Sequence, residues 1–185
     1  DVFKSRAANF NVEFKLARIA PDGSYTEGIT RTYDPINMIE DYEDRDNEAK
    51  SVALAWDRNR YLNIWVVKEI KSSGTGTILG YAQFPGQQAS TDGIVMIHDR
   101  VGTIGTAVSS GKGRTLTHEI GHWLGLYHPF QGGCSGNGDR VDDTPPVAEA
   151  SYGCTASQNP NTCNTDFPNE IDMVENYMDY ANGTC

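Results

Sequence analysis

The chain has 185 residues, of which 15 are basic and 25 are acidic, and its formal net charge is −10. This length suits one domain with its own apolar core. The acidic balance argues against nucleic acid or an anionic membrane as a partner, and no apolar run is long enough to cross a bilayer. No leader segment is recognisable, so we expect a secreted monomer in a processed or truncated form, soluble outside the cell.

The first part of the chain predicts short strands separated by turns. Residues 11–20, NVEFKLARIA, alternate apolar and polar side chains, which is typical of a strand. PDGS at 21–24 is typical of a turn, and GITRTY at 28–33 is a second strand candidate. Residues 48–57, EAKSVALAWD, have helical spacing and predict a short helix.

Three further strands are expected before residue 103. YLNIWVVKEI, from Tyr61, is dense in β-branched and aromatic residues, as expected of a strand buried on both faces. ILGYAQFPG at 78–86 and the run at 93–102 are the other two. His98 lies in the last of these strands, where we expect a packed or surface residue.

The rest of the chain predicts one helix followed by irregular structure. A helix is expected to begin near Arg114 or Thr115, and after His128 glycine, asparagine, proline and cysteine recur without a period. We therefore expect an α+β fold in a single domain of residues 1–185. A mixed twisted sheet and the helix would form the half 1–128, a loop-rich half would span 129–185, and a cleft would lie between the halves.

The run HEIGHWLGLYH at 118–128 contains three of the four histidines. His118 and His122 are four residues apart and lie on one face of a helix, where both can bind one ion. His128 can join them only if the helix ends and the chain turns back, and Gly125 permits this because glycine readily adopts the left-handed conformation. Three imidazoles with one open position are how catalytic zinc is held. Glu119, beside them, is placed to act as general base on a zinc-bound water.

Four cysteines, at positions 134, 154, 163 and 185, follow this run. None belongs to a CxxC pair, so a second zinc held by cysteines is not expected. An even number of cysteines in a loop-rich segment predicts two disulfides and an oxidising compartment. The residues themselves leave three pairings open.

The histidine run matches HExxHxxGxxH, the metzincin signature of zinc metalloproteases. Together with TDGIVMIHDR, GDRVDDTPP and NYMDY, it resembles the pappalysin family of metzincins. The resemblance is strong from about Ile78 to Cys185 and implies a secreted zinc endopeptidase acting on extended peptide segments. Members of the family usually extend beyond both ends of this sequence, which implies truncation at both ends.

The resemblance also implies roles for individual residues. NYMDY at 176–180 resembles the Met-turn, with Met178 as an apolar pad beneath the histidines and Tyr180 directed towards the metal as a hydrogen-bond donor. A structural calcium is implied at Asp139 and Thr144, with the backbone carbonyls of Gly138 and Asp142. The alternative interpretation of these residues is an Asx-turn in a solvated acidic loop.

Disulfides Cys134–Cys163 and Cys154–Cys185 are likewise implied by the resemblance. Gly80, Tyr81 and Ala82 would belong to a rim strand to which an extended substrate adds. Arginine-preferring members carry an aspartate at the position of Thr184. Because threonine cannot neutralise a buried guanidinium, we expect no basic preference after the cut unless Asp179 or Asp172 lines that pocket.

Two other functions remain open at the level of sequence. One is a catalytically inactive zinc-binding interaction module, and the presence of Glu119 argues against it. The other is a zinc hydrolase that acts on a non-peptide amide, and the predicted rim strand argues only weakly against it.

Overall fold

The computed structural model describes residues 3–9, 11–33, 39–41, 47–72, 74, 76–108, 111–135, 138–153, 160–165 and 169–181. It contains two compact units, Asp1–Ile97 and His98–Cys185. The sequence placed the division after His128, but the contacts group the histidine-bearing helix with the residues that follow it.

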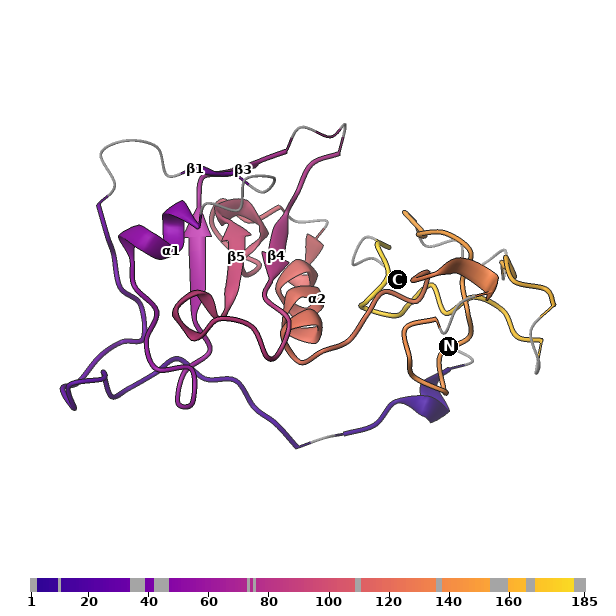
Figure 1. The fold of residues 1–185 in the computed structure, drawn as a ribbon, viewed down its shortest axis with the longest axis horizontal. Coiled ribbons are helices and arrows are strands. Elements are labelled where there is room, and N and C mark those ends of the chain that lie inside the picture. The colour runs from indigo at the N-terminus through magenta and orange to yellow at the C-terminus, as the bar shows by residue number, and fades with distance from the viewer. Residues whose placement is uncertain are drawn as a thin grey trace. The chain divides into compact units, whose positions relative to one another are not determined.

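The first unit contains the predicted mixed sheet. Strand β5 (Ile94–Ile97) pairs in parallel with β2 (Ile64–Val67) and antiparallel with β4 (Gly80–Ala82), in the order β2-β5-β4 (Figure 1). Val95 lies opposite both Trp65 and Tyr81 in this register. A second parallel pair is formed by β1 (Ile39–Asp41) and β3 (Glu69–Lys71). All four residues of the central strand β5 are buried.

The apolar core of this unit lies on one face of β2. Trp65 and Val67 are buried, whereas Ile64 and Val66 alternate with them and are 39% and 47% exposed. The prediction of a strand buried on both faces is therefore wrong for β2, because β-branched composition does not distinguish an end strand from a central one. The core also contains Ile70 from β3 and Val95 and Ile97 from β5.

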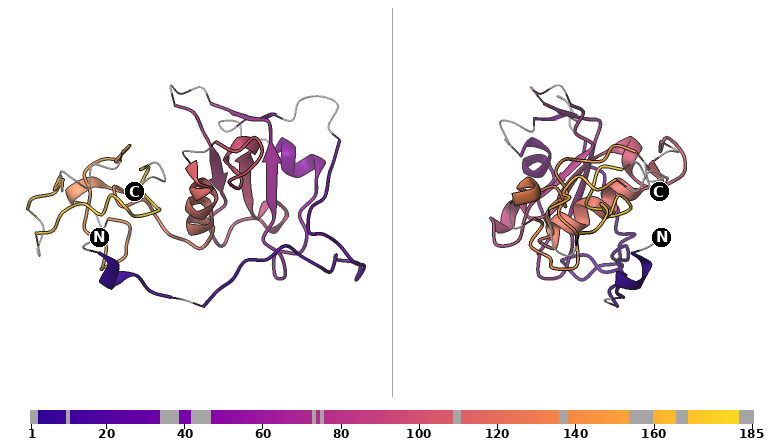
Figure 2. Two further views of the ribbon diagram at one scale, coloured as in Figure 1. Left: turned by 180° about the vertical axis from the view of Figure 1, so that it is seen from behind. Right: turned by 90° about the vertical axis from the view of Figure 1, so that its right-hand side faces the viewer.

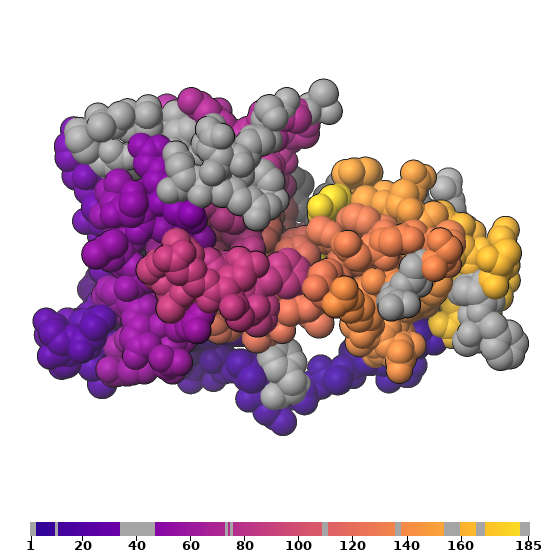
Figure 3. Space-filling model, in the orientation of Figure 1, coloured from indigo at the N-terminus to yellow at the C-terminus, as the bar shows by residue number. Residues whose placement is uncertain are grey.

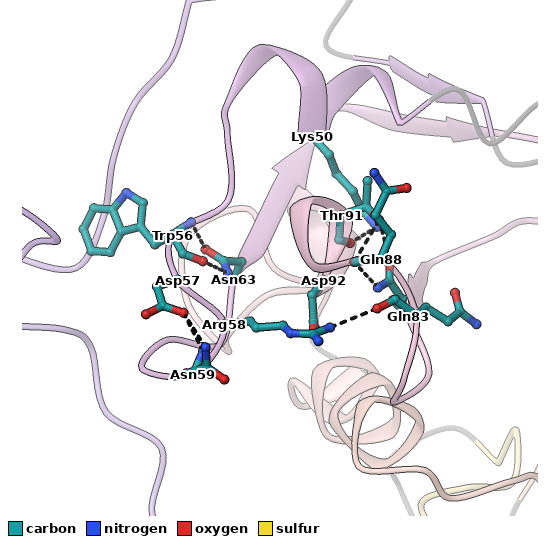
Figure 4. Close-up of polar contacts among 11 residues, drawn as sticks. Lys50, Trp56, Asp57, Arg58, Asn59, Asn63, Gln83, Gln88, Thr91 and Asp92 are labelled. Atoms are coloured by element: carbon teal, nitrogen blue, oxygen red, sulfur yellow. Dashed lines mark hydrogen bonds and ion pairs between the residues drawn. The ribbon is translucent and has the colours of Figure 1, made fainter.

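Helix α1 (Glu48–Val52) packs against β1 and β2 but is half as long as predicted (Figures 1 and 2). The side chain of Asn63 explains the early end: its Oδ1 accepts from Trp56 N at 2.8 Å and its Nδ2 donates to Trp56 O at 2.9 Å (Figure 4). These bonds take up both backbone groups of Trp56 and hold that segment beside the start of β2. Lys50 on α1 donates to Thr91 O at 2.8 Å.

The strands predicted for residues 11–20 and 28–33 do not form. This segment contains one isolated bridge, between Ile19 and Tyr25, around the predicted turn, where Gly23 N donates to Ala20 O at 2.9 Å. Figure 3 shows the indigo N-terminal segment along the lower edge of the purple and magenta atoms, and Phe14 and Leu16 are 45% and 59% exposed. Alternation marks the side that a strand would bury, but a strand also needs a partner for its backbone.

The second unit contains helix α2 (Arg114–Trp123), which begins where the sequence predicted. The other helical elements of its described residues are 3₁₀ turns, His98–Arg100 and Gly133–Ser135. His98 lies in the first turn and is exposed, so its placement in a strand was wrong. No helix among the described residues has the length and apolar character needed to cross a membrane.

Covalent and polar links hold the loops of the second unit. The Cys134–Cys163 disulfide forms as implied, whereas Cys154 and Cys185 lie outside the described residues. Next to it, the buried carboxylate of Asp172 accepts from the backbone and hydroxyl of Thr162, at 3.1 Å and 2.9 Å. A disulfide contributes about 2–4 kcal/mol, which matters in a unit with little regular structure.

Candidate functional site

The end of α2 reverses the chain as the sequence predicted. Gly125 has φ of 99°, and its N–H donates to His122 O at 2.9 Å. Leu126 N donates to Gly121 O at 2.9 Å, which completes a Schellman motif. This turn brings His128 back to the face of α2 that carries His118 and His122.

The three histidines converge on one point through their Nε2 atoms. Nε2 of His122 is 3.0 Å from that of His118 and 3.0 Å from that of His128, and the third separation is 3.2 Å. Nδ1 of His118 lies 2.7 Å from Tyr177 O, and Nδ1 of His122 lies 2.8 Å from Leu126 O. Because a carbonyl only accepts, each of these Nδ1 atoms carries the proton and each Nε2 carries a lone pair.

Converging lone pairs define a cation site. Two acceptor nitrogens 3.0 Å apart repel each other unless a Lewis acid lies between them. Separations of 3.0–3.2 Å allow all three nitrogens to bind one ion at the zinc–nitrogen distance of about 2.0–2.1 Å. Among the described residues, this is the one group of three histidine, cysteine or acidic side chains whose ligand atoms meet.

Electrostatics keep the three imidazoles in the ligand form. Burial, assisted by the neighbouring imidazoles, lowers the pKa of His118 to about 4 and that of His128 to about 3. Burial also lowers the pKa of His122. The rings are therefore neutral at neutral pH, as metal binding requires.

Glu119 is nearly enclosed, with 5% of its surface exposed. Burial disfavours its carboxylate and raises its pKa to about 8 in the metal-free protein. It follows His118 directly on α2, so a cation held by the histidines favours the charged form. A carboxyl group with a raised pKa beside a metal is suited to exchange protons near neutral pH.

The Met-turn, residues 176–180, lies against α2. Met178 is 6% exposed, and a Cβ atom added to Gly121 would collide with the sulfur and terminal methyl of Met178. Asn176 supports the turn by accepting from Met178 N at 2.9 Å. Sequence reasoning missed Gly121, although an isolated glycine inside a helical pattern is a signal of close packing.

Aromatic rings surround the histidines on the Met-turn side. Phe130 stacks on His128 with 4.7 Å between ring centroids and 8° between planes. The ring of Tyr180 lies 4.9 Å from that of His128 and 5.7 Å from that of His118, and Tyr180 is 43% exposed. Tyr180 thus borders the histidines and reaches solvent. Phe130 was also missed, because one aromatic two residues after a histidine carries no signal by itself.

The residues of the implied calcium loop are partly brought together. Asp139 is buried, accepts from Val141 N at 3.0 Å and is hydrogen-bonded by the Thr144 side chain, whereas Asp142 is exposed. Burial raises the pKa of Asp139 despite these hydrogen bonds. Gly138 has φ of 52°, which bends the loop in front of Asp139.

The predicted substrate-binding residues fall into two groups. Gly80, Tyr81 and Ala82 form β4, the last strand in the sheet order of the first unit. Thr184 lies outside the described residues. Asp179, the proposed alternative acid, is buried. Its Oδ1 accepts hydrogen bonds from Ser151 N at 2.9 Å and from Tyr180 N at 2.7 Å, so this oxygen is used to hold the backbone of two neighbouring segments.

This geometry defines a metallohydrolase centre of the metzincin type, and comparison with known proteins identifies its family. The model of peptidase family M43, described as pregnancy-associated plasma protein-A, matches residues 45–185. The chain belongs to this family, the pappalysins.

Curated relatives carry names in agreement with this assignment. An extracellular metalloprotease of Neurospora crassa is 41% identical over 145 residues, which are 74% of this chain and 47% of the relative. One from Podospora anserina is 33% identical over 190 residues, covering 100% of this chain and 57% of the relative. The chain spans about half the length of the first curated relatives it matches.

Solved structures confirm the fold. Mirolysin in complex with compound 9 has a TM-score of 0.84 and 39% identity, over 100% of this chain and 68% of the other. Mature mirolysin of Tannerella forsythia in complex with a cleaved peptide has a TM-score of 0.79 and 38% identity, with the same coverage. The α+β fold with a mixed sheet and a histidine-bearing helix is therefore that of a metzincin catalytic domain.

Replacing Gly121 by alanine is expected to displace Met178 and, with it, the carbonyl that orients His118. We expect a loss of about 1–3 kcal/mol in the free energy of unfolding, the usual cost of overpacking, and weaker zinc binding. Urea unfolding and zinc titration against a competing chelator measure the two effects. Gly111→Ala is the matched control, because a Cβ atom there meets nothing within 4 Å. Equal behaviour of the two variants would contradict the packing role of Gly121.

The raised pKa of Glu119 predicts how the metal-free protein responds to pH. At pH values between 4.5, the ordinary pKa of glutamate, and about 8, Glu119 is ionised in the unfolded chain but protonated in the folded chain. Glu119 therefore lowers the free energy of unfolding as the pH rises through this range. Metal-free Glu119→Gln should therefore match the wild type at pH 4 and gain about 1 kcal/mol per pH unit through that window. Urea unfolding at several pH values measures the difference in free energy of unfolding between the variant and the wild type. The contribution of the histidines is the same in both proteins and cancels in this difference. A pH-independent difference would disprove it.

Proposed function

We propose that this chain is a zinc-dependent endopeptidase that hydrolyses peptide bonds in extended segments of proteins. The observation that carries the proposal is the convergence of three neutral imidazole Nε2 atoms within 3.0–3.2 Å, next to a buried glutamate. His118, His122 and His128 would hold the zinc, which when bound polarises the scissile carbonyl and lowers the pKa of the attacking water.

Glu119 supplies the proton transfers. As a carboxylate it takes the proton of the attacking water, and it then delivers that proton to the leaving amine, so one group serves as base and acid in turn. Burial keeps bulk water from competing for the proton. Tyr180, which borders His118 and His128, donates its hydroxyl hydrogen to the oxygen that becomes negative in the transition state.

An extended substrate would bind along β4. Its place at the end of the order β2-β5-β4 supports this role, because an end strand offers backbone groups to an added strand. The solved mirolysin complex with a cleaved peptide supports a peptide substrate by similarity.

With threonine at position 184, we expect no preference for arginine or lysine after the cut. The extracellular naming of the relatives supports secretion, and we infer a monomer.

We also propose that the chain binds a structural calcium. Its ligands would be the side chains of Asp139 and Thr144 and the backbone carbonyls of Gly138 and Asp142. Its support is the buried Asp139, whose carboxylate is disfavoured by its surroundings and would be stabilised by a divalent cation. Carboxylate, hydroxyl and carbonyl oxygens are the ligands that calcium prefers.

Removal of the carboxylate at position 119 tests the catalytic role. Glu119→Gln should keep zinc, because the three ligands remain, and lower kcat by at least about 100-fold through loss of general base and acid catalysis. Casein digestion with and without a zinc chelator, together with metal analysis, measures both properties. Glu149→Gln, at an exposed site of the same unit, should behave as wild type. Near-normal hydrolysis by Glu119→Gln would rule out the mechanism, and a wild type that binds zinc without cleaving would favour the inactive module.

Calcium removal should lower the thermal unfolding midpoint. We expect a drop of several degrees in a calcium-selective chelator, reversed by calcium but not by zinc, because the ion binds only the folded loop. Asp139→Asn should lower the midpoint and abolish the response to calcium, whereas Glu149→Gln should retain it. If the wild type shows no response to calcium, the loop is a solvated acidic turn.

A further inference from the structure

Helix α2 contacts one residue of the Met-turn at two points. Arg114 and His118 are four residues apart, so they lie on the same face of α2 on consecutive turns. The guanidinium carbon of Arg114 lies 4.3 Å from the centroid of the Tyr177 ring, while Nδ1 of His118 donates to the Tyr177 carbonyl at 2.7 Å. Side chain and backbone of Tyr177 are thus bound by two successive turns of one helix.

We propose that Arg114 is a positioning residue for the metal centre, acting through Tyr177; this inference rests on the proposed zinc site. A cation over the face of an aromatic ring is attracted by the negative charge of that face. The stack fixes where Tyr177 lies along α2, and its carbonyl then fixes the orientation of the His118 ring. Outer partners of ligating histidines control metal affinity in this way.

The neighbours of Tyr177 extend the effect of the stack. Met178 directly follows Tyr177 and packs on Gly121. Tyr180, three residues after Tyr177, lies beside His118 and His128. If Tyr177 shifts along the helix, its carbonyl that orients His118, the apolar pad Met178 and the proposed oxyanion donor Tyr180 all move together. Arg114 therefore influences metal affinity and turnover without touching either metal or substrate.

The contact between Arg114 and Tyr177 lies at the surface. Arg114 is exposed and Tyr177 is 47% exposed, so truncating the arginine creates no buried cavity and leaves no buried charge unpaired. The first unit provides a matched control, because Arg60 stacks on Tyr61 with 5.3 Å between guanidinium carbon and ring centroid. Arg60→Ala removes the same kind of contact away from the histidines in sequence and in a different unit.

The experiment measures zinc affinity by chelator competition and the visible absorption of the cobalt-substituted protein, which reports ligand geometry. Arg114→Ala should weaken zinc binding by about two- to fivefold, the factor expected for an exposed cation–π contact, and change the cobalt spectrum. Arg114→Lys should restore part of the loss, because it keeps the cation. Tyr177→Phe should keep wild-type affinity, because the ring and the carbonyl remain, and Arg60→Ala should change neither measurement.

A double-mutant cycle decides whether Arg114 acts through the ring. In a Tyr177→Leu background, Arg114→Ala should cause no further loss of zinc affinity, since the stack is already absent. An equal loss in both backgrounds, or an unchanged cobalt spectrum in Arg114→Ala, would overturn the proposal. Thermal unfolding of the zinc-loaded variants separates a general loss of folding from a local effect. A wild type that binds zinc but cleaves no peptide would refute the proposed activity and leave this test intact.

Discussion

The metal centre depends on the hydrogen bonds that two histidines make on the side away from the metal. Tyr177 O accepts a hydrogen bond from His118 Nδ1, and Leu126 O accepts one from His122 Nδ1. These bonds fix both rings so that their Nε2 lone pairs point towards each other. One carbonyl comes from the turn that ends α2 and the other from the Met-turn. The helix end and the Met-turn therefore both determine which tautomer the ligands adopt and where they point.

This arrangement is suited to a divalent cation. Three neutral imidazoles are held where their lone pairs repel, and a glutamate is buried where its charge is disfavoured. A divalent cation held by the three Nε2 atoms would accept the lone pairs and stabilise the carboxylate of Glu119.

Other contacts hold the loops of the second unit in place. The Cys134–Cys163 disulfide, the Asp172 carboxylate on Thr162 and the Asp179 carboxylate on Ser151 connect segments that have little regular structure. Val147 and Val174 are fully buried among them. Buried acids that accept backbone N–H groups replace the hydrogen bonds that helices and strands would otherwise supply.

The sequence by itself determined the convergence of the three histidines, the neighbouring glutamate, the stop at Gly125 and the start of α2, because helical periodicity and glycine's conformational freedom are local properties. It also indicated β5 and the turn at residues 21–24. Tertiary structure decided that residues 11–20 form no strand, that β2 is buried on one face and that α1 ends at Val52, since each depends on a partner distant in the chain. It alone revealed Gly121 against Met178 and Arg114 on Tyr177, because packing and stacking partners over fifty residues apart leave no local pattern.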